Sequence, residues 1–279
     1  MLLYDKLQNI SLSALYKDAM ELQCNDPKLV AVGMAGSLLS QLFGKKWMSD
    51  NILTNDNIGF LFNKSEDIFA EEKFQLQILT IAEAIFNLRK IGGIECILDR
   101  LQNDKIDSVI AELESGRLLC HRGLLFKFVK RNFQKRHDFD IHIIDSPNDI
   151  FCETKCKIDT TVFSGNSFEN SLHKAKQQLP KELPALILIK IPYLWDQHEA
   201  ELKNISKLFV KKSVRPLGIV CWHEKWTKIN NIFSAKITIG FEEHNNKSKL
   251  HNARILPFLP NKPYSPYWIS FEKFASGYL

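Results

Sequence analysis

The spacing of apolar positions along residues 106–191 predicts a helix, three strands, a second helix and a further strand. Apolar residues recur at helical spacing over 106–120, and Gly123 is expected to end that helix. The apolar run at 124–129 is typical of a first strand. The elements expected next are strands at 138–144 and 150–155, a helix at 168–179 and a fully buried strand at 184–191.

The regions on either side differ in their pattern. Residues 1 to about 100 show mainly helical periodicity, strongest at 12–22, 29–43 and 69–88. Gly92 and Gly93 interrupt this pattern, so we expect a helical N-terminal domain over 1–100 and a second domain over 101–279. A helix at 200–210 and strands at 217–222 and 235–241 are predicted to extend the sheet. The expected class is α/β, with a mixed sheet flanked by helices.

Two successive predicted strands carry a group of charged residues. Alternate residues of a strand face the same way, so Asp138 and Asp140 share one face, and Glu153 and Lys155 share a face of the next strand. Carboxylate oxygens are ligands that Mg²⁺ prefers, and a nearby cation can act on an attacking water or on developing charge. This arrangement meets the needs of phosphodiester hydrolysis. The alternative is a hairpin with a solvated charged edge.

The helix before these strands offers a further carboxylate. Glu112 lies roughly 80° from the middle of the apolar stripe and Glu114 roughly 120°, so Glu112 is the better candidate to reach the site. Glu114 remains an alternative. The pattern acid-x-Lys recurs elsewhere in the chain, and what distinguishes Glu153 and Lys155 is their position after an acidic strand and a polar turn.

In this order of elements the sequence resembles the PD-(D/E)xK nuclease superfamily over about residues 105–195. The motifs that carry the resemblance are Glu112-Leu-Glu-Ser-Gly-Arg-Leu-Leu, Lys135-Arg-His-Asp138-Phe-Asp-Ile, Glu153-Thr-Lys155 and Ala175-Lys-Gln-Gln-Leu179-Pro180. The resemblance implies a restriction-endonuclease-like fold and an endonuclease that cuts DNA with Mg²⁺ or Mn²⁺. His137 stands where the family usually has a proline.

The resemblance also implies a metal-ligand set. Asp138 and Glu153 would hold the metal together with the main-chain carbonyl of Thr154, and Glu112 would act directly or through water. Asp140 would take the place of Asp138 if the strand register differs by two residues.

Lys155 has two alternative roles under the same resemblance. It would deprotonate the attacking water, which requires a lowered pKa, or it would stabilise negative charge as an ammonium. Gln177 and Gln178 on the following helix would orient a phosphate or a water, the alternative being an exposed helical face.

Composition is that of a globular chain, with 279 residues, 45% hydrophobic and 25% charged. It has no apolar run of about 20 residues, and its first residues lack the basic start and following apolar segment of a signal peptide. We therefore expect no membrane partner and a cytoplasmic location. The six scattered cysteines favour reduced thiols. Cys152 and Cys156 would lie in extended chain rather than in a tight turn, which disfavours a zinc-stabilised module.

The net charge of +5 favours an acidic partner. Basic residues cluster before the acidic strand and form what we call the basic collar: Lys127, Lys130, Arg131, Lys135 and Arg136. Such a collar could neutralise phosphates, so nucleic acid, DNA first, is the expected partner, with a homodimer left open. A solvated charged face is the alternative interpretation. The alternative function is a non-catalytic nucleic-acid-binding protein of the same fold in a defence or mobile-element system.

Overall fold

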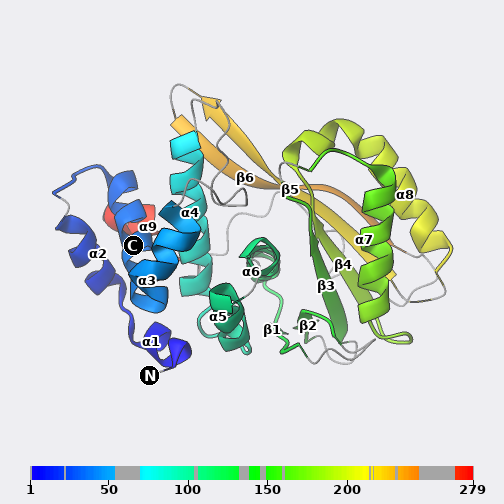
Figure 1. The fold of residues 1–279 in the computed structure, drawn as a ribbon, viewed down its shortest axis with the longest axis horizontal. Coiled ribbons are helices and arrows are strands. Elements are labelled where there is room, and N and C mark those ends of the chain that lie inside the picture. Colours follow the sequence, from blue (N-terminus) through cyan, green and yellow to red (C-terminus); the bar gives the residue numbers. More distant parts are fainter. Residues whose placement is uncertain are drawn as a thin grey trace. The chain divides into compact units, whose positions relative to one another are not determined.

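The computed structural model of the chain divides into two compact units, residues 1–106 with 266–279, and residues 107–265 (Figure 1). The first unit therefore includes the C-terminal segment, which the sequence analysis places with the second domain. The structure describes residues 2–21, 23–53, 70–103, 106–131, 138–144, 149–158, 161–213, 215, 217–229, 232–244 and 268–278.

The described part of the first unit is helical. Local sequence accounts for two of the helix starts, because the Ser11 hydroxyl accepts a hydrogen bond from the N–H of Ala14, and the Asp26 carboxylate accepts one from the N–H of Lys28. The elements are α1 (Leu3–Asn9), α2 (Leu12–Met20), α3 (Pro27–Met48), the π-helical turn η1 (Ser49–Leu53), α4 (Ala70–Asn87), α5 (Ile94–Asn103) and α9 (Phe271–Ala275). Helices are thus found where the sequence predicts them.

Side chains of helix α4 hold the main chain of the C-terminal segment through hydrogen bonds. Glu83 Oε1 accepts from the N–H of Phe271 at 2.7 Å. The side chain of Asn87 accepts from the N–H of Ile269 at 2.7 Å and donates to its carbonyl at 2.8 Å. The rings of Phe86 and Phe271 meet edge to face, with centroids 5.6 Å apart. These contacts explain why the two ends of the sequence belong to one unit.

The second unit is built on a mixed sheet of six strands among the described residues, in the order β1-β2-β3-β4-β5-β6. β1, β2 and β3 pair antiparallel, β3, β4 and β5 pair parallel, and β6 is antiparallel to β5. The strands are β1 (Phe126–Phe128), β2 (Ile141–Ile143), β3 (Ile150–Cys156), β4 (Ala185–Lys190), β5 (Leu217–Ile229) and β6 (Ile232–His244). The α/β class is therefore confirmed.

Helices cover the two faces of the parallel strands (Figure 1). α7 (Gly165–Gln178) and α8 (Glu199–Lys211) provide the crossovers from β3 to β4 and from β4 to β5, with the 3-10 segment η2 (Tyr193–His198) before α8. They pack on one face through an apolar cluster that includes Phe168, Leu172, Ile187, Ile219 and Phe209. The other face receives α6 (Ile106–His121). All six residues of β4 are buried, as expected for a strand covered on both faces.

A buried ion cluster joins α6 to the sheet. Lys190 Nζ of β4 lies 2.8 Å from Glu114 Oε2 and 3.5 Å from Glu224 Oε2 of β5. The three side chains are 4%, 1% and 7% exposed, so the charges compensate one another out of contact with water. Burial raises the pKa of Glu114 to about 8, against the opposing effect of Lys190.

The hairpin that carries the acidic residues differs from its predicted form. β2 begins at Ile141, so Asp138 and Asp140 precede the strand instead of lying within it. β3, β4, α6 and α7 lie within three residues of their predicted ends. Gly123 follows α6 with φ +69°, a conformation that favours glycine at a helix end.

We predict that Lys190→Met lowers the free energy of unfolding by about 3–5 kcal/mol, because two buried carboxylates lose their shared cation. The measurement is urea unfolding near pH 8. Lys203→Met is the control, since Lys203 forms an exposed pair with Glu199 one helical turn away and its loss should cost no more than about 0.5 kcal/mol. Equal losses in the two variants would show that the buried cluster contributes no more than a surface pair.

Candidate functional site

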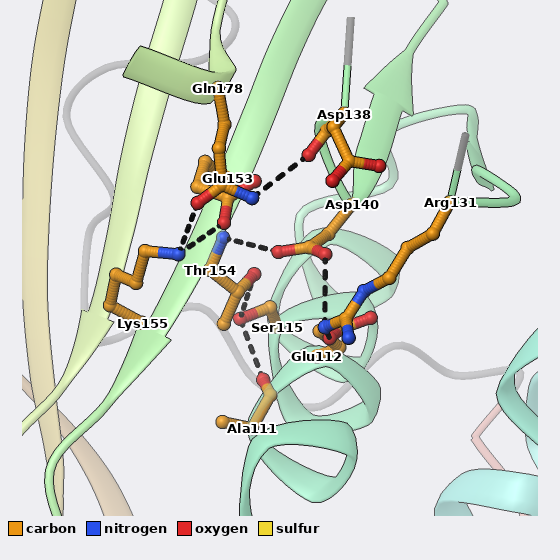
Figure 2. Close-up of polar contacts among 10 residues, drawn as sticks. All are labelled: Ala111, Glu112, Ser115, Arg131, Asp138, Asp140, Glu153, Thr154, Lys155 and Gln178. Atoms are coloured by element: carbon orange, nitrogen blue, oxygen red, sulfur yellow. Dashed lines mark hydrogen bonds and ion pairs between the residues drawn. The ribbon is translucent and has the colours of Figure 1, made fainter. Parts of the chain in front are cut away.

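The structure gathers carboxylates from three elements of the second unit (Figure 2). Glu112 comes from α6 and Glu153 from β3. The register between β2 and β3 pairs Ile141 with Cys152, so Asp140, one residue before β2, lies across from Glu153. Glu112, Asp140 and Glu153 are buried, with 1%, 2% and 1% of their surface exposed.

Asp140 is held by the backbone of the neighbouring strand. Its Oδ2 accepts a hydrogen bond of 2.8 Å from the main-chain N–H of Thr154. Its Oδ1 is buried and has no hydrogen-bond partner. The Thr154 hydroxyl lies 3.5 Å from the Ser115 hydroxyl of α6, which ties this strand to the helix that carries Glu112. One oxygen of Asp140 is thus fixed by a hydrogen bond, and the other accepts none.

Glu153 and Lys155 lie on one face of β3, as the sequence predicts. Lys155 Nζ donates to Glu153 Oε1 at 2.5 Å and to Gln178 Oε1 at 2.6 Å. Gln178 in turn donates through Nε2 to the main-chain carbonyl of Asp138 at 3.1 Å. The second oxygen of Glu153, Oε2, is buried without a hydrogen-bond partner. The last residue of α7 therefore fixes the lysine beside the carboxylate.

Arg131 supplies a cation between two of the carboxylates. Its Nη2 lies 3.1 Å from Glu112 Oε1 and 3.9 Å from Asp140 Oδ1. The Arg131 side chain is 31% exposed whereas each carboxylate is 2% exposed, so the arginine reaches the buried acids from the solvent side. Figure 2 shows its guanidinium beside both acids.

Burial controls the protonation of the two opposed carboxyl groups. It raises the pKa of Asp140 to about 7, and the charge of Glu153 adds to the increase while the N–H of Thr154 opposes it. Burial likewise raises the pKa of Glu153 to about 7, against the opposing effect of Lys155. Near neutral pH each carboxyl group is therefore present in both its protonated and its ionised form, and a cation that binds them would displace protons.

The predicted site residues are only partly brought together. Glu112, Glu153 and Lys155 are in the site, and Asp140 is the acid that faces Glu153. Asp138 is half-buried and contributes its carbonyl to Gln178.

The other candidates have different positions. Glu114 points to Lys190 in the buried ion cluster. Gln177 is exposed, while Gln178 binds Lys155. Thr154 contributes its N–H to Asp140. Lys135, Arg136 and His137 lie outside the described residues.

Arg131, which was expected only in the basic collar, also takes part in the site. A signal was present in α6, where Glu112 and Glu114 lie two residues apart in an apolar helix. Two acids buried on one helix each require a compensating group, and basic residues near in space are the usual source. Arg131 and Lys190 fill these positions.

The site offers some, but not all, of the ligand atoms that a divalent cation needs. Within the described ranges no three His, Cys, Asp or Glu side chains are grouped closely enough to hold a metal ion. Two buried carboxylate oxygens, Asp140 Oδ1 and Glu153 Oε2, nevertheless lack hydrogen-bond partners. Hard anionic oxygens of this kind suit Mg²⁺ or Mn²⁺, which complete their coordination with water and substrate oxygens. Asp140 and Glu153 are the residues that would hold such an ion.

Comparisons with protein-family models, with curated proteins and with solved structures return no match for this chain. None of the helices in the described ranges is both long and apolar enough to span a bilayer. The case for a function therefore rests on the site itself.

The raised pKa values predict how stability changes with pH when metal is absent. The ordinary values of Asp140 and Glu153 are 3.8 and 4.5, and both rise to about 7 on folding. The folded chain therefore binds more protons than the unfolded chain between about pH 4 and 7, so its stability falls as pH rises through this window. Asp140→Asn should reduce the slope by up to about 1.4 kcal/mol per pH unit.

Urea unfolding in the presence of a chelator measures this slope. Glu114→Gln is the matched comparison, because Glu114 lies away from the candidate site, beside Lys190. The pKa of Glu114 is also raised, to about 8, so the contribution of this group to the slope extends to about pH 8. A slope in Asp140→Asn equal to that of the parent would mean that Asp140 is ionised in the folded chain throughout this window.

Proposed function

We propose that the chain is a metal-dependent nuclease that hydrolyses DNA phosphodiester bonds by attack of water, on a restriction-endonuclease-like fold. The observation that carries the proposal is the pair of opposed, buried carboxylates of Asp140 and Glu153, each with one oxygen that lacks a hydrogen-bond partner, beside a fixed lysine. The order α6, β1, β2, β3, α7, β4 supports it, because the PD-(D/E)xK resemblance implies this order.

Asp140 and Glu153 would hold the metal, with Asp140 in the place first expected for Asp138. A bound Mg²⁺ supplies Lewis-acid activation of the phosphate and of the attacking water. The hydrogen bond from Thr154 N–H fixes the Asp140 carboxylate, and Lys155 fixes that of Glu153, so both acids are oriented before a ligand arrives. Glu112 would take part directly or through water.

Lys155 is better suited to stabilise charge than to act as a base. Its ammonium donates to Glu153 and Gln178, which uses two of its three N–H donors and leaves one for a substrate oxygen or water. Gln178 is the positioning residue that keeps this ammonium in place.

Exposed lysines in the segments that adjoin the site residues in sequence favour DNA as the substrate. Lys127 and Lys130 of the basic collar are exposed, as are Lys174 and Lys181 on and after α7. Such lysines can neutralise phosphates and offset the repulsion between a polyanion and the buried acids. The net charge of +5 likewise favours binding of a polyanion.

A non-catalytic nucleic-acid-binding protein of the same fold is the second candidate. It is favoured by the absence, among the described residues, of a group of three acidic, histidine or cysteine side chains close enough to hold a metal. The two candidates differ in whether the chain cuts nucleic acid, and the following two experiments separate them.

The first experiment measures Mn²⁺ binding by calorimetry. The parent should bind Mn²⁺ and gain thermal stability by mass action, and Asp140→Asn should weaken binding by roughly tenfold or more. Asp138→Asn decides between the two acids, and we expect it to stay within a few-fold of the parent. The reverse ranking would make Asp138 the ligand, whereas equal affinity in the parent, both variants and Glu153→Gln would eliminate the site.

The second experiment measures cleavage of labelled single-stranded, duplex and branched DNA under single-turnover conditions with Mg²⁺ or Mn²⁺. Lys155→Ala should still bind metal and lose roughly 10²-fold in rate, the scale of lost charge stabilisation. Lys157→Ala is the matched control, because Lys157 follows two residues later and donates to Ser167 instead. Equal rates in Lys155→Ala and the parent would refute the role of Lys155. A metal-bound parent that cuts neither DNA nor RNA would favour the binding protein.

A further inference from the structure

Arg131 occupies the space where two of the candidate ligands would have to meet. A single nitrogen, Nη2, lies 3.1 Å from Glu112 Oε1 and 3.9 Å from Asp140 Oδ1 (Figure 2). Carboxylate oxygens bind Mg²⁺ at about 2.0–2.1 Å, so both acids cannot contact one ion while a guanidinium lies between them. Arginine and metal are therefore alternative partners of the same carboxylates.

Either cation, the Arg131 guanidinium or a divalent metal ion, can compensate the negative charge of Glu112 and Asp140. Glu112 and Asp140 are buried, and carboxylates removed from water need a compensating cation. Arg131 provides one that is always charged, and a divalent ion would provide another. The carboxylates are fixed on α6 and by the backbone of β3, whereas Arg131 enters from the solvent side with 31% of its side chain exposed. The arginine is thus the member of the group that can leave.

We propose that Arg131 is an internal counter-ion that competes with the metal and is released by a phosphate of the nucleic acid. The inference rests on the proposed function and adds its regulation. A guanidinium binds phosphate oxygens through paired hydrogen bonds, and it does so best when it is not engaged by carboxylates. Phosphate binding then draws Arg131 from Glu112 and Asp140, and the metal takes its place. Metal and nucleic acid therefore bind with positive coupling, and metal binds weakly without substrate.

Calorimetry with Mn²⁺ on the full chain tests the competition. Arg131→Met should bind Mn²⁺ about tenfold or more tightly than the parent, since the competing cation is gone. Lys130→Met is the matched control: it removes the same charge from the neighbouring, exposed residue and should stay within about twofold of the parent. Equal or weaker Mn²⁺ binding in Arg131→Met than in Lys130→Met would overturn the proposal.

A second measurement uses the parent alone and does not depend on the folding of a variant. A single-stranded phosphorothioate oligonucleotide, which resists cleavage, should raise the affinity of the parent for Ca²⁺ by about fivefold or more, the lower end of typical coupling. Unchanged Ca²⁺ affinity with the oligonucleotide bound would overturn the release by phosphate.

Failure of the proposed function has a different result. In that case Asp140→Asn and Arg131→Met would both bind Mn²⁺ as the parent does, because the carboxylates would hold no metal at all. A different outcome separates the two proposals. If Asp140→Asn weakens Mn²⁺ binding while Arg131→Met leaves it unchanged, the metal site stands and the competition by Arg131 is rejected.

Discussion

The cost of removing carboxylates from water is the constraint on which the second unit depends. α6 is buried from Val109 to Gly116, and this stretch contains both Glu112 and Glu114. Each acid lies beside a cation from a different segment, Arg131 beside Glu112 and Lys190 beside Glu114. Without these partners the helix could not lie against the sheet with its acids ionised. The same pairing sets the position of α6 and the charge of the candidate site.

The two ion clusters on α6 differ in the exposure of their cations to solvent. The Glu114 cluster is closed, because Lys190 is only 4% exposed and fixed on a central strand. The Glu112 cluster is open on the side of Arg131, which is 31% exposed. A closed cluster contributes to the architecture, whereas an open one can change partners. Each cluster contains a buried carboxylate oxygen without a hydrogen-bond partner, Glu114 Oε1 in the closed cluster and Asp140 Oδ1 in the open one, but only Asp140 lies next to a partly exposed cation.

Much of the fold was predictable from periodicity, and the site was predictable in part. β3, the apolar run of β4 and the helical spacing of α6 lie where they were expected, because a buried face imposes a regular pattern. The choice between Asp138 and Asp140 was not predictable, because it depends on the strand register. The backbone pairing of Ile141 with Cys152 sets that register. The contact of Arg131 was missed because it joins residues 19 positions apart through side chains that have no common period.

The contacts of the site span very different lengths of chain. Asp140 and Thr154 are 14 residues apart within one hairpin, whereas Thr154 and Ser115 of α6 are 39 apart. Because the entropy lost on closing a loop grows with its length, the hairpin contact is the less costly to form. The acids of β3 and of the segment before β2 can therefore meet while water still surrounds them. Their removal from water also requires α6, whose contacts with the site join residues 19 and 39 positions apart, so the loops closed for their dehydration are longer than the loop that brings them together.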